Sequence, residues 1–122
     1  MTTAILIDPF AKEVKSVEID VGDFEAIYAL LRCTQVDAEE FGSDGDLFVV
    51  DDEGLLINSD EQEYFSFATE IHGRMILAGR TLVVGSTKSG DWILPASTLS
   101  DVLTRILWTD HATGAAYARQ FS

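Results

Sequence analysis

Short hydrophobic runs separated by polar turns dominate this chain and predict strands more often than helices. The first two runs, residues 4–7 and 14–19, flank a polar segment and predict a β-hairpin with a longer loop. Residues 46–51 form a strongly hydrophobic run of the buried-strand type, and the turn at 52–54 predicts a second hairpin with residues 55–58. Further strands are expected at residues 34–41, 75–78 and 81–84, with a turn at 42–45.

Two segments instead repeat their hydrophobic residues at helical spacing. A helix is expected at residues 23–32, with Asp23 or Asp20 as its N-cap, and a second one at about 98–108, capped by Ser97 or Thr98. Residues 59–71 give mixed signals, because a helix-like start precedes the strand-like alternation of residues 64–69. Phe65 and Phe67 share the expected core face of that alternation, which leaves Tyr64 as an exposed aromatic candidate.

These elements predict an α+β fold with a mainly antiparallel, twisted sheet of five to seven strands and two helices, one or both packed on a single face. We expect one domain over residues 1–110. The C-terminal tail, residues 111–122, is small and polar and is either loose or docked.

Composition supports a folded, soluble and cytoplasmic protein. The chain has 122 residues and 47% hydrophobic residues, yet no hydrophobic run approaches the roughly 18 residues of a membrane helix. Its first ten residues lack the basic region of a signal peptide. The single Cys33 cannot form an internal disulfide, and we expect it to be a core thiol.

Charge is distributed very unevenly along the chain. Twelve acidic residues and no Lys or Arg lie between Cys33 and Gly73, whereas eight basic residues face nine acids elsewhere, which gives a net charge of −13. Such a field disfavours nucleic acid and anionic membranes and favours basic partners. The acids that we expect at a partner-binding face are Asp37, Glu39, Glu40, Asp44, Asp46, Asp51, Asp52 and Glu53.

No pattern of a catalytic or metal site emerges. When Gly45 is placed at the sixth position of a calcium loop, Gly42 falls at the third and Asp51 at the twelfth, where an EF-hand requires an oxygen ligand and a Glu. No nucleophile–base pair or metal spacing involves His72 or His111, so we expect no catalytic residue, metal or cofactor.

A small set of cationic and aromatic residues provides an alternative site. Arg74, Arg80 and Lys88 supply the positive charge of the second half before its last helix, and Tyr64 could stack against a ligand. If neighbouring strands bring these residues together, they would form a small anion-binding pocket. Pairing of the cations with the acidic surface is the simpler interpretation.

Three segments, in order, resemble a known family: AILIDPFAKEVKSVEI, DLFVVDDEGLLIN and LAGRTLVVGSTKSGDWILPASTLSDV. Together they are similar to domain of unknown function 3846, a family of small proteins of bacteria, phages and plasmids. The resemblance covers roughly residues 4–108 and implies association with mobile elements. It implies no catalytic residues, because its motifs are turns and strands. The tail after Trp108 and the acids of residues 59–63 fall outside the family pattern.

Three functional hypotheses follow. The first is a non-enzymatic interaction protein of a phage or other mobile element that presents its acidic face to a basic host protein, as a DNA mimic or anti-defence factor. The second is a small-molecule binder, such as a sponge for a nucleotide signal. The third is a housekeeping domain whose acidic surface serves only solubility. Exposed sheet edges further predict a homodimer.

Overall fold

The computed structural model describes residues 1–42, 44–57 and 59–121. Ser43, in the expected turn 42–45, Asn58, at the end of the expected strand 55–58, and Ser122 lie outside the described residues. The α-helices are α1 (Phe24–Leu31), α2 (Leu99–Arg105) and α3 (His111–Ala118), and the 3-10 helices are η1 (Gly54–Leu56), η2 (Ser59–Glu61) and η3 (Arg119–Phe121). The strands are β1 (Thr2–Asp8), β2 (Glu13–Ile19), β3 (Val36–Glu40), β4 (Leu47–Asp51), β5 (Tyr64–Thr69), β6 (Gly73–Ala78), β7 (Thr81–Ser86), β8 (Trp92–Ile93) and β9 (Ile106–Trp108).

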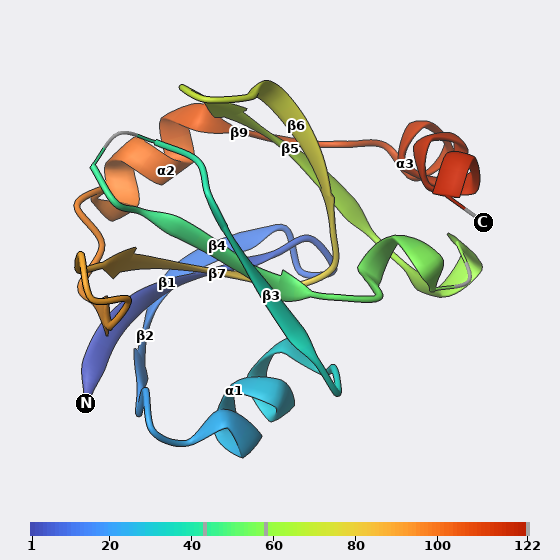
Figure 1. The fold of residues 1–122 in the computed structure, drawn as a ribbon. Coiled ribbons are helices and arrows are strands. Elements are labelled where there is room, and N and C mark those ends of the chain that lie inside the picture. The colour runs from blue at the N-terminus through green and yellow to red at the C-terminus, as the bar shows by residue number, and fades with distance from the viewer. Residues whose placement is uncertain (43, 58, 122) are drawn as a thin grey trace.

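The strands form two antiparallel sheets (Figure 1). The larger sheet has the order β2-β1-β7-β4-β3, with β8 paired to β7 as its sixth strand, and the smaller one has the order β6-β5-β9. This arrangement confirms the α+β class with a mainly antiparallel sheet, and it adds a second sheet and the helix α3. The strands β3 and β6 are edge strands of the two sheets.

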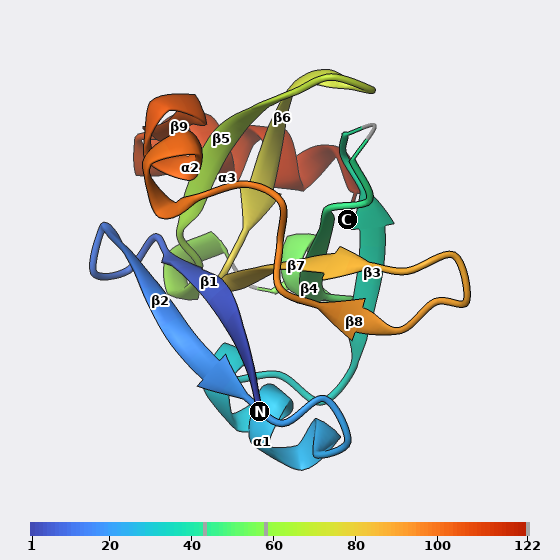
Figure 2. The ribbon, with the colours of Figure 1, turned by 90° about the vertical axis from the view of Figure 1, so that its left-hand side faces the viewer.

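The two sheets and the helices form layers, because the central strands are hydrophobic on both faces (Figure 2). Along β1, Ala4 and Leu6 pack in a cluster with Ile27 and Leu31 of α1. The alternating residues Ile5 and Ile7 belong to a second cluster with residues of β5, β6 and α2. The larger sheet therefore lies between α1 on one face and the smaller sheet with α2 on the other, so the two expected helices do not share a face.

Local capping signals place the helix starts correctly. Asp23 accepts a hydrogen bond from the Ala26 backbone N–H at 3.1 Å, which confirms the start of the first expected helix. Thr98 and Asp101 form a capping box at α2, in which each side chain accepts a hydrogen bond from the other residue's backbone N–H.

The expected helix at 98–108 is too long. It ends at Arg105, and residues 106–108 form β9, in which Ile106 pairs with Phe67 and Trp108 with Phe65 of β5. The apolar residues at the end of the expected helix therefore pair with Phe65 and Phe67 of β5, about forty residues earlier in the sequence. Pairing with β5 outweighs the weak helical preference of Ile and Trp.

The second expected hairpin is wrong. Residues 54–56 form η1 in place of a strand, with the Leu56 N–H donating to the Glu53 carbonyl at 2.9 Å. The strand β4 already pairs with β3 on one side and β7 on the other, so it has no free edge for residues 55–57. In residues 59–71, the helix-like start forms the 3-10 helix η2, and the alternating residues that follow form the strand β5.

The C-terminal tail is docked as α3 against the outer face of the smaller sheet. Gly114, Ala115 and Ala118 are buried there, and Tyr64 packs with Ala118 and Ala78. An added Cβ at Gly114 would overlap the Tyr64 ring, so this helix approaches β5 closely. Tyr64 is therefore 1% exposed, and its expected place on the surface is wrong because α3 covers that face. In the described part of the chain, no helix is long and apolar enough to cross a membrane.

Candidate functional site

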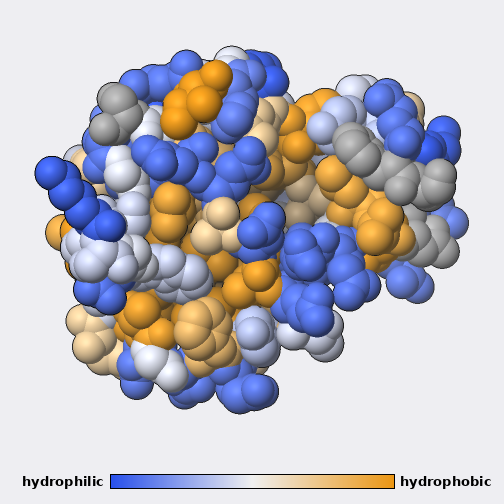
Figure 3. Space-filling view, in the orientation of Figure 1, coloured by the Kyte–Doolittle hydropathy of each residue, from blue (hydrophilic) through white to orange (hydrophobic). Residues whose placement is uncertain are grey.

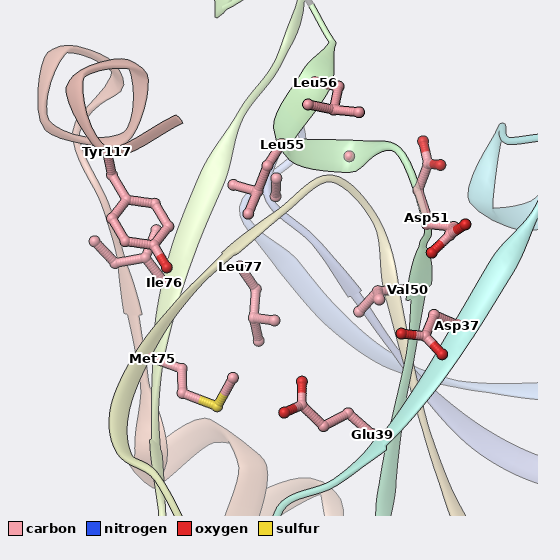
Figure 4. Close-up of a pocket in the computed structure, with 13 residues that line it drawn as sticks. Asp37, Glu39, Val50, Asp51, Leu55, Leu56, Met75, Ile76, Leu77 and Tyr117 are labelled. Atoms are coloured by element: carbon pink, nitrogen blue, oxygen red, sulfur yellow. The ribbon is translucent and has the colours of Figure 1, made fainter. Parts of the chain in front are cut away.

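A groove of about 450 Å³ lies between the edge strands β3 and β6 (Figure 4). Its volume is within the range of about 300–1,000 Å³ that is usual for ligand sites. One wall comes from β3 and the end of β4, the other from β6, and η1 and Tyr117 of α3 complete it. The residues that line the groove are Asp37, Glu39, Val50, Asp51, Asp52, Gly54, Leu55, Leu56, Met75, Ile76, Leu77, Ala78 and Tyr117.

The first wall of the groove is acidic, as the alternation of β3 dictates. Asp37 pairs with Val50 of β4, and Glu39 pairs with Phe48, whose side chain belongs to the core between the two sheets. Cross-strand partners share a face, so Asp37 and Glu39 point toward the smaller sheet. Figure 4 shows the Glu39 carboxyl group directed across the groove toward β6.

The opposite wall is hydrophobic. Met75 and Leu77 of β6 face the acidic wall, whereas Ile76 lies beside Tyr117 at the rim of the groove (Figure 4). Leu55 and Leu56 of η1 extend the hydrophobic surface at one end. Leu56 is 60% exposed, although it is a large hydrophobic side chain. In Figure 3, hydrophobic surface is visible in the hollow between the sheets and the lobe that carries α3, beside hydrophilic surface over the β4–η1 turn.

The two ends of the groove are held by contacts between the sheets. At one end, the Glu70 N–H donates to the Phe41 carbonyl at 3.2 Å, and His72 Nε2 lies 3.3 Å from Glu39 Oε1. At the other end, Gln62 Nε2 donates to the Gly54 carbonyl at 2.9 Å, and Gly54 lies against the Ala78 carbonyl. The gap between β3 and β6 is therefore fixed at both ends and open between them.

Local hydrogen bonds orient two of the groove's carboxylates. Asp37 Oδ1 accepts from the Ala38 backbone N–H at 3.0 Å, and Asp51 Oδ1 accepts from the Glu53 N–H at 2.9 Å. Among the described residues that line the groove there is no Lys or Arg. The acidic wall therefore retains the capacity to bind a cationic group.

The structure divides the eight acids expected at a partner-binding face. Four of them line the groove: Asp37, Glu39, Asp51 and Asp52. Glu40 is exposed on the opposite face of β3 from Glu39, and Asp44 and Glu53 are exposed in turns.

Asp46 does not belong to the acidic surface, which corrects the expectation for this residue. Its side chain is 0% exposed, and its two carboxylate oxygens accept hydrogen bonds from the Ala96 and Ser97 backbone N–H groups at 2.8 and 2.9 Å. These bonds tie the start of β4 to the segment before α2. Asp46 is therefore a structural residue.

The alternative anion-binding set is not brought together. Arg74 donates to Ser66 Oγ at one end of β6, and Lys88 is exposed in the turn between β7 and β8. Arg80, just beyond the other end of β6, lies 3.4 Å from Asp8 and stacks over the Phe10 ring. It lines a second cavity of about 250 Å³ that also contains the acids Asp51 and Glu61. Tyr64 is buried beneath α3, so the four residues form no common pocket.

The remaining candidates for a reactive or metal-binding role are Cys33, His111 and clusters of metal-ligating side chains. Burial raises the pKa of the Cys33 thiol, and the nearby Asp51 charge raises it further against a hydrogen bond with Gln35, so the thiol is poorly suited to act as a nucleophile. His111 Nδ1 lies 3.7 Å from Glu63. Within residues 1–42, 44–57 and 59–121, no group of three or more His, Cys, Asp or Glu residues is arranged to hold a metal ion.

Sequence reasoning identified the acidic wall but missed the hydrophobic one. Met75, Ile76 and Leu77 were expected only as an ordinary strand, and Leu55 and Leu56 as part of a hairpin. The Leu55-Leu56 pair directly after an acidic turn is the available signal in the sequence. Tyr117 lies in the tail, and nothing in its neighbourhood in the sequence points to the groove.

Comparison with known proteins bears out the family resemblance. A family model described as Domain of unknown function (DUF3846) matches residues 1–106. The match includes every residue that lines the groove except Tyr117. No curated protein and no solved structure matches the chain.

Proposed function

Because the chain belongs to the DUF3846 family, whose description assigns no activity, we propose a function from its groove: the protein binds a basic segment of a partner protein between β3 and β6. The single observation that carries this proposal is the pairing of an acidic wall with a hydrophobic wall in one open groove.

Lys and Arg side chains match both walls. Each has a hydrocarbon stem that can lie on Met75 and Leu77, and a cationic head that can reach Asp37 or Glu39 on the facing wall. A simple anion would be repelled by these carboxylates, and a purely hydrophobic ligand would leave them desolvated without a partner. A chain segment with basic and hydrophobic side chains satisfies the whole lining.

The charge of the whole molecule supports the same partner. With a net charge of −13, the protein attracts a basic partner over distances of about one Debye length, ~8–10 Å at ordinary ionic strength. This field increases the rate of encounter, whereas the groove provides the specific contacts.

The resemblance to proteins of phages and plasmids extends the proposal to the identity of the partner. A basic, nucleic-acid-binding host protein would bind the acidic surface in the way that it binds phosphates. In the cytoplasm, this is the role of a DNA mimic or an anti-defence factor. The competing proposal is that the acids serve solubility alone. The proposed nucleotide-signal sponge has lost its best support, since Arg74, Arg80, Lys88 and Tyr64 are apart.

A series of three short peptides tests the proposal. Each has about seven residues, enough to span β3 at ~3.3 Å per residue, and alternates Val with Lys, Ser or Glu. Fluorescence anisotropy at about 0.05 M and 0.5 M salt measures their dissociation constants. We expect the Lys peptide alone to bind, about tenfold more weakly at the higher salt concentration. Equal affinity for all three peptides, or no binding by any of them, would contradict the proposal and favour the solubility role.

A further inference from the structure

The strand β3 is an edge strand, and alternate residues direct their backbone groups toward its outer edge. The Asp52 N–H donates to the Gln35 carbonyl at 3.1 Å, and the Phe41 N–H donates to the Asp46 carbonyl at 3.3 Å. In an antiparallel pair, hydrogen-bonded positions alternate, so residues 35, 37, 39 and 41 direct their backbone groups toward β4. Val36, Ala38 and Glu40 therefore direct their N–H and C=O groups outward.

Alternate residues of β6 likewise direct their backbone groups away from the partner strand β5. The Gly79 N–H donates to the Glu63 carbonyl at 2.9 Å, so the odd-numbered residues of β6 bond to β5. Arg74, Ile76 and Ala78 direct their backbone groups away from β5, and Gly54 covers the Ala78 carbonyl. Among the residues that the structure describes, no strand pairs with the outer backbone edge of β3 or of β6.

The β3 edge carries two features that protect an unpaired strand. Its inward-facing residues, Asp37 and Glu39, are charged, and Asp37 Oδ1 occupies the outward N–H of Ala38 at 3.0 Å. A cationic side chain on an added strand can bind this carboxylate and compensate the charge that a neutral or acidic strand would leave desolvated. The acids of this edge therefore favour a basic strand over a neutral or acidic one.

We propose, on the basis of the function proposed above, that the partner segment binds as an added β-strand on β3, with basic side chains at alternate positions facing Asp37 and Glu39. Main-chain hydrogen bonds to Val36, Ala38 and Glu40 supply affinity, and the acidic wall selects the sequence. The five residues of β3 accommodate about five residues of the partner at ~3.3 Å each.

A second copy of this chain is a poor occupant of the same edge. The other edge of the larger sheet is β2, which carries Glu13 and Glu18. Its one cation, Lys15, lies 3.7 Å from Glu13. A β2 edge placed on β3 would bring acids against Asp37 and Glu39, and like charges on facing strands are destabilising.

Backbone methylation of the Lys–Val peptide tests strand addition directly. In one form, the backbone nitrogens of all Val residues are methylated, and in the matched form those of all Lys residues. A peptide strand added to β3 bonds to it through only one of the peptide's two edges. The N–H groups on that edge belong either to the Val residues or to the Lys residues, because the two alternate. We expect one form to lose at least about tenfold in affinity and the other to lose less, measured by fluorescence anisotropy.

The outcomes separate the two proposals. If the unmodified peptide binds and both methylated forms bind equally well, strand addition is wrong, while the groove still binds a basic segment. If the unmodified peptide does not bind, the proposed function fails, and strand addition fails with it. A dimer that forms at the peptide-free β3 edge, detected by sedimentation and abolished by the Lys peptide, would identify a second copy as the occupant and overturn the choice of partner.

Discussion

Single residues decide which part of the acidic run is available to a partner. Asp46 and Asp52 are both acids in the same third of the sequence, yet Asp46 is fully buried and Asp52 is exposed on the groove. The difference comes from two backbone N–H groups about fifty residues away, at Ala96 and Ser97, which no local pattern predicts. Counting charges along the chain therefore overestimates the number of acids on the binding face.

Replacement of Asp46 by Ala should destabilise the fold strongly. The change removes the acceptor of the buried Ser97 N–H and of the partly buried Ala96 N–H. Bonds to a charged acceptor contribute roughly 1.5–3 kcal/mol each, so we expect a loss of about 3–6 kcal/mol. Urea unfolding followed by circular dichroism measures this loss. Asp52→Ala is the matched control and should change the free energy of unfolding by less than about 0.5 kcal/mol. Equal effects of the two substitutions would show that Asp46 has no structural role.

At the level of elements, capping patterns locate helix starts, whereas helix ends and sheet partners depend on distant residues. Asp23 and Thr98 mark the starts of α1 and α2 because a cap is a local hydrogen bond. The end of α2 is set by pairing of β9 with β5, and the docking of α3 by its close approach to Tyr64.

Replacement of Gly114 by Ala tests the docking of α3. In an exposed helix this change stabilises by about 1 kcal/mol. Here the new Cβ overlaps the Tyr64 ring, and overpacking costs about 1–3 kcal/mol, so we expect net destabilisation. Hydrogen exchange of residues 111–118 should become faster. The double variant Tyr64→Ala/Gly114→Ala removes the overlap, and there the Gly114 substitution should no longer destabilise. Slower exchange in the single variant would contradict the close approach.

The capping box of α2 should make stability depend on pH. Hydrogen bonds from the Thr98 backbone and side chain hold the pKa of Asp101 below its ordinary value of 3.8. The stabilisation is therefore fully present above pH 3.8 and is lost as the pH falls through the lower pKa of the folded state. We expect Asp101→Asn to lower the melting temperature at pH 7, and the difference from the wild type should shrink as the pH falls below 3.8. A difference that stays constant with pH would contradict this account.

For the whole molecule, the sequence predicts the α+β class and the acidic wall but not the groove. The hairpin β1–β2 and the buried β4 follow from alternation and runs that are visible locally. The groove requires two edge strands from different sheets to face each other, and β3 and β6 are more than thirty residues apart. Their opposition arises from the core between the sheets, where Phe48, Phe67 and Leu77 pack together.

The central claim is that the inward acids of β3, rather than negative charge in general, bind a basic segment. The most direct measurement compares the affinity of the Lys–Val peptide for two double variants, Asp37→Asn/Glu39→Gln and Glu18→Gln/Glu25→Gln. Both remove two negative charges, but Glu18 lies on β2, at the other edge of the larger sheet, and Glu25 on α1. We predict a loss of at least about tenfold for the first variant and less than about twofold for the second. Equal losses for the two variants would show that only the net charge matters and would contradict a binding site in the groove.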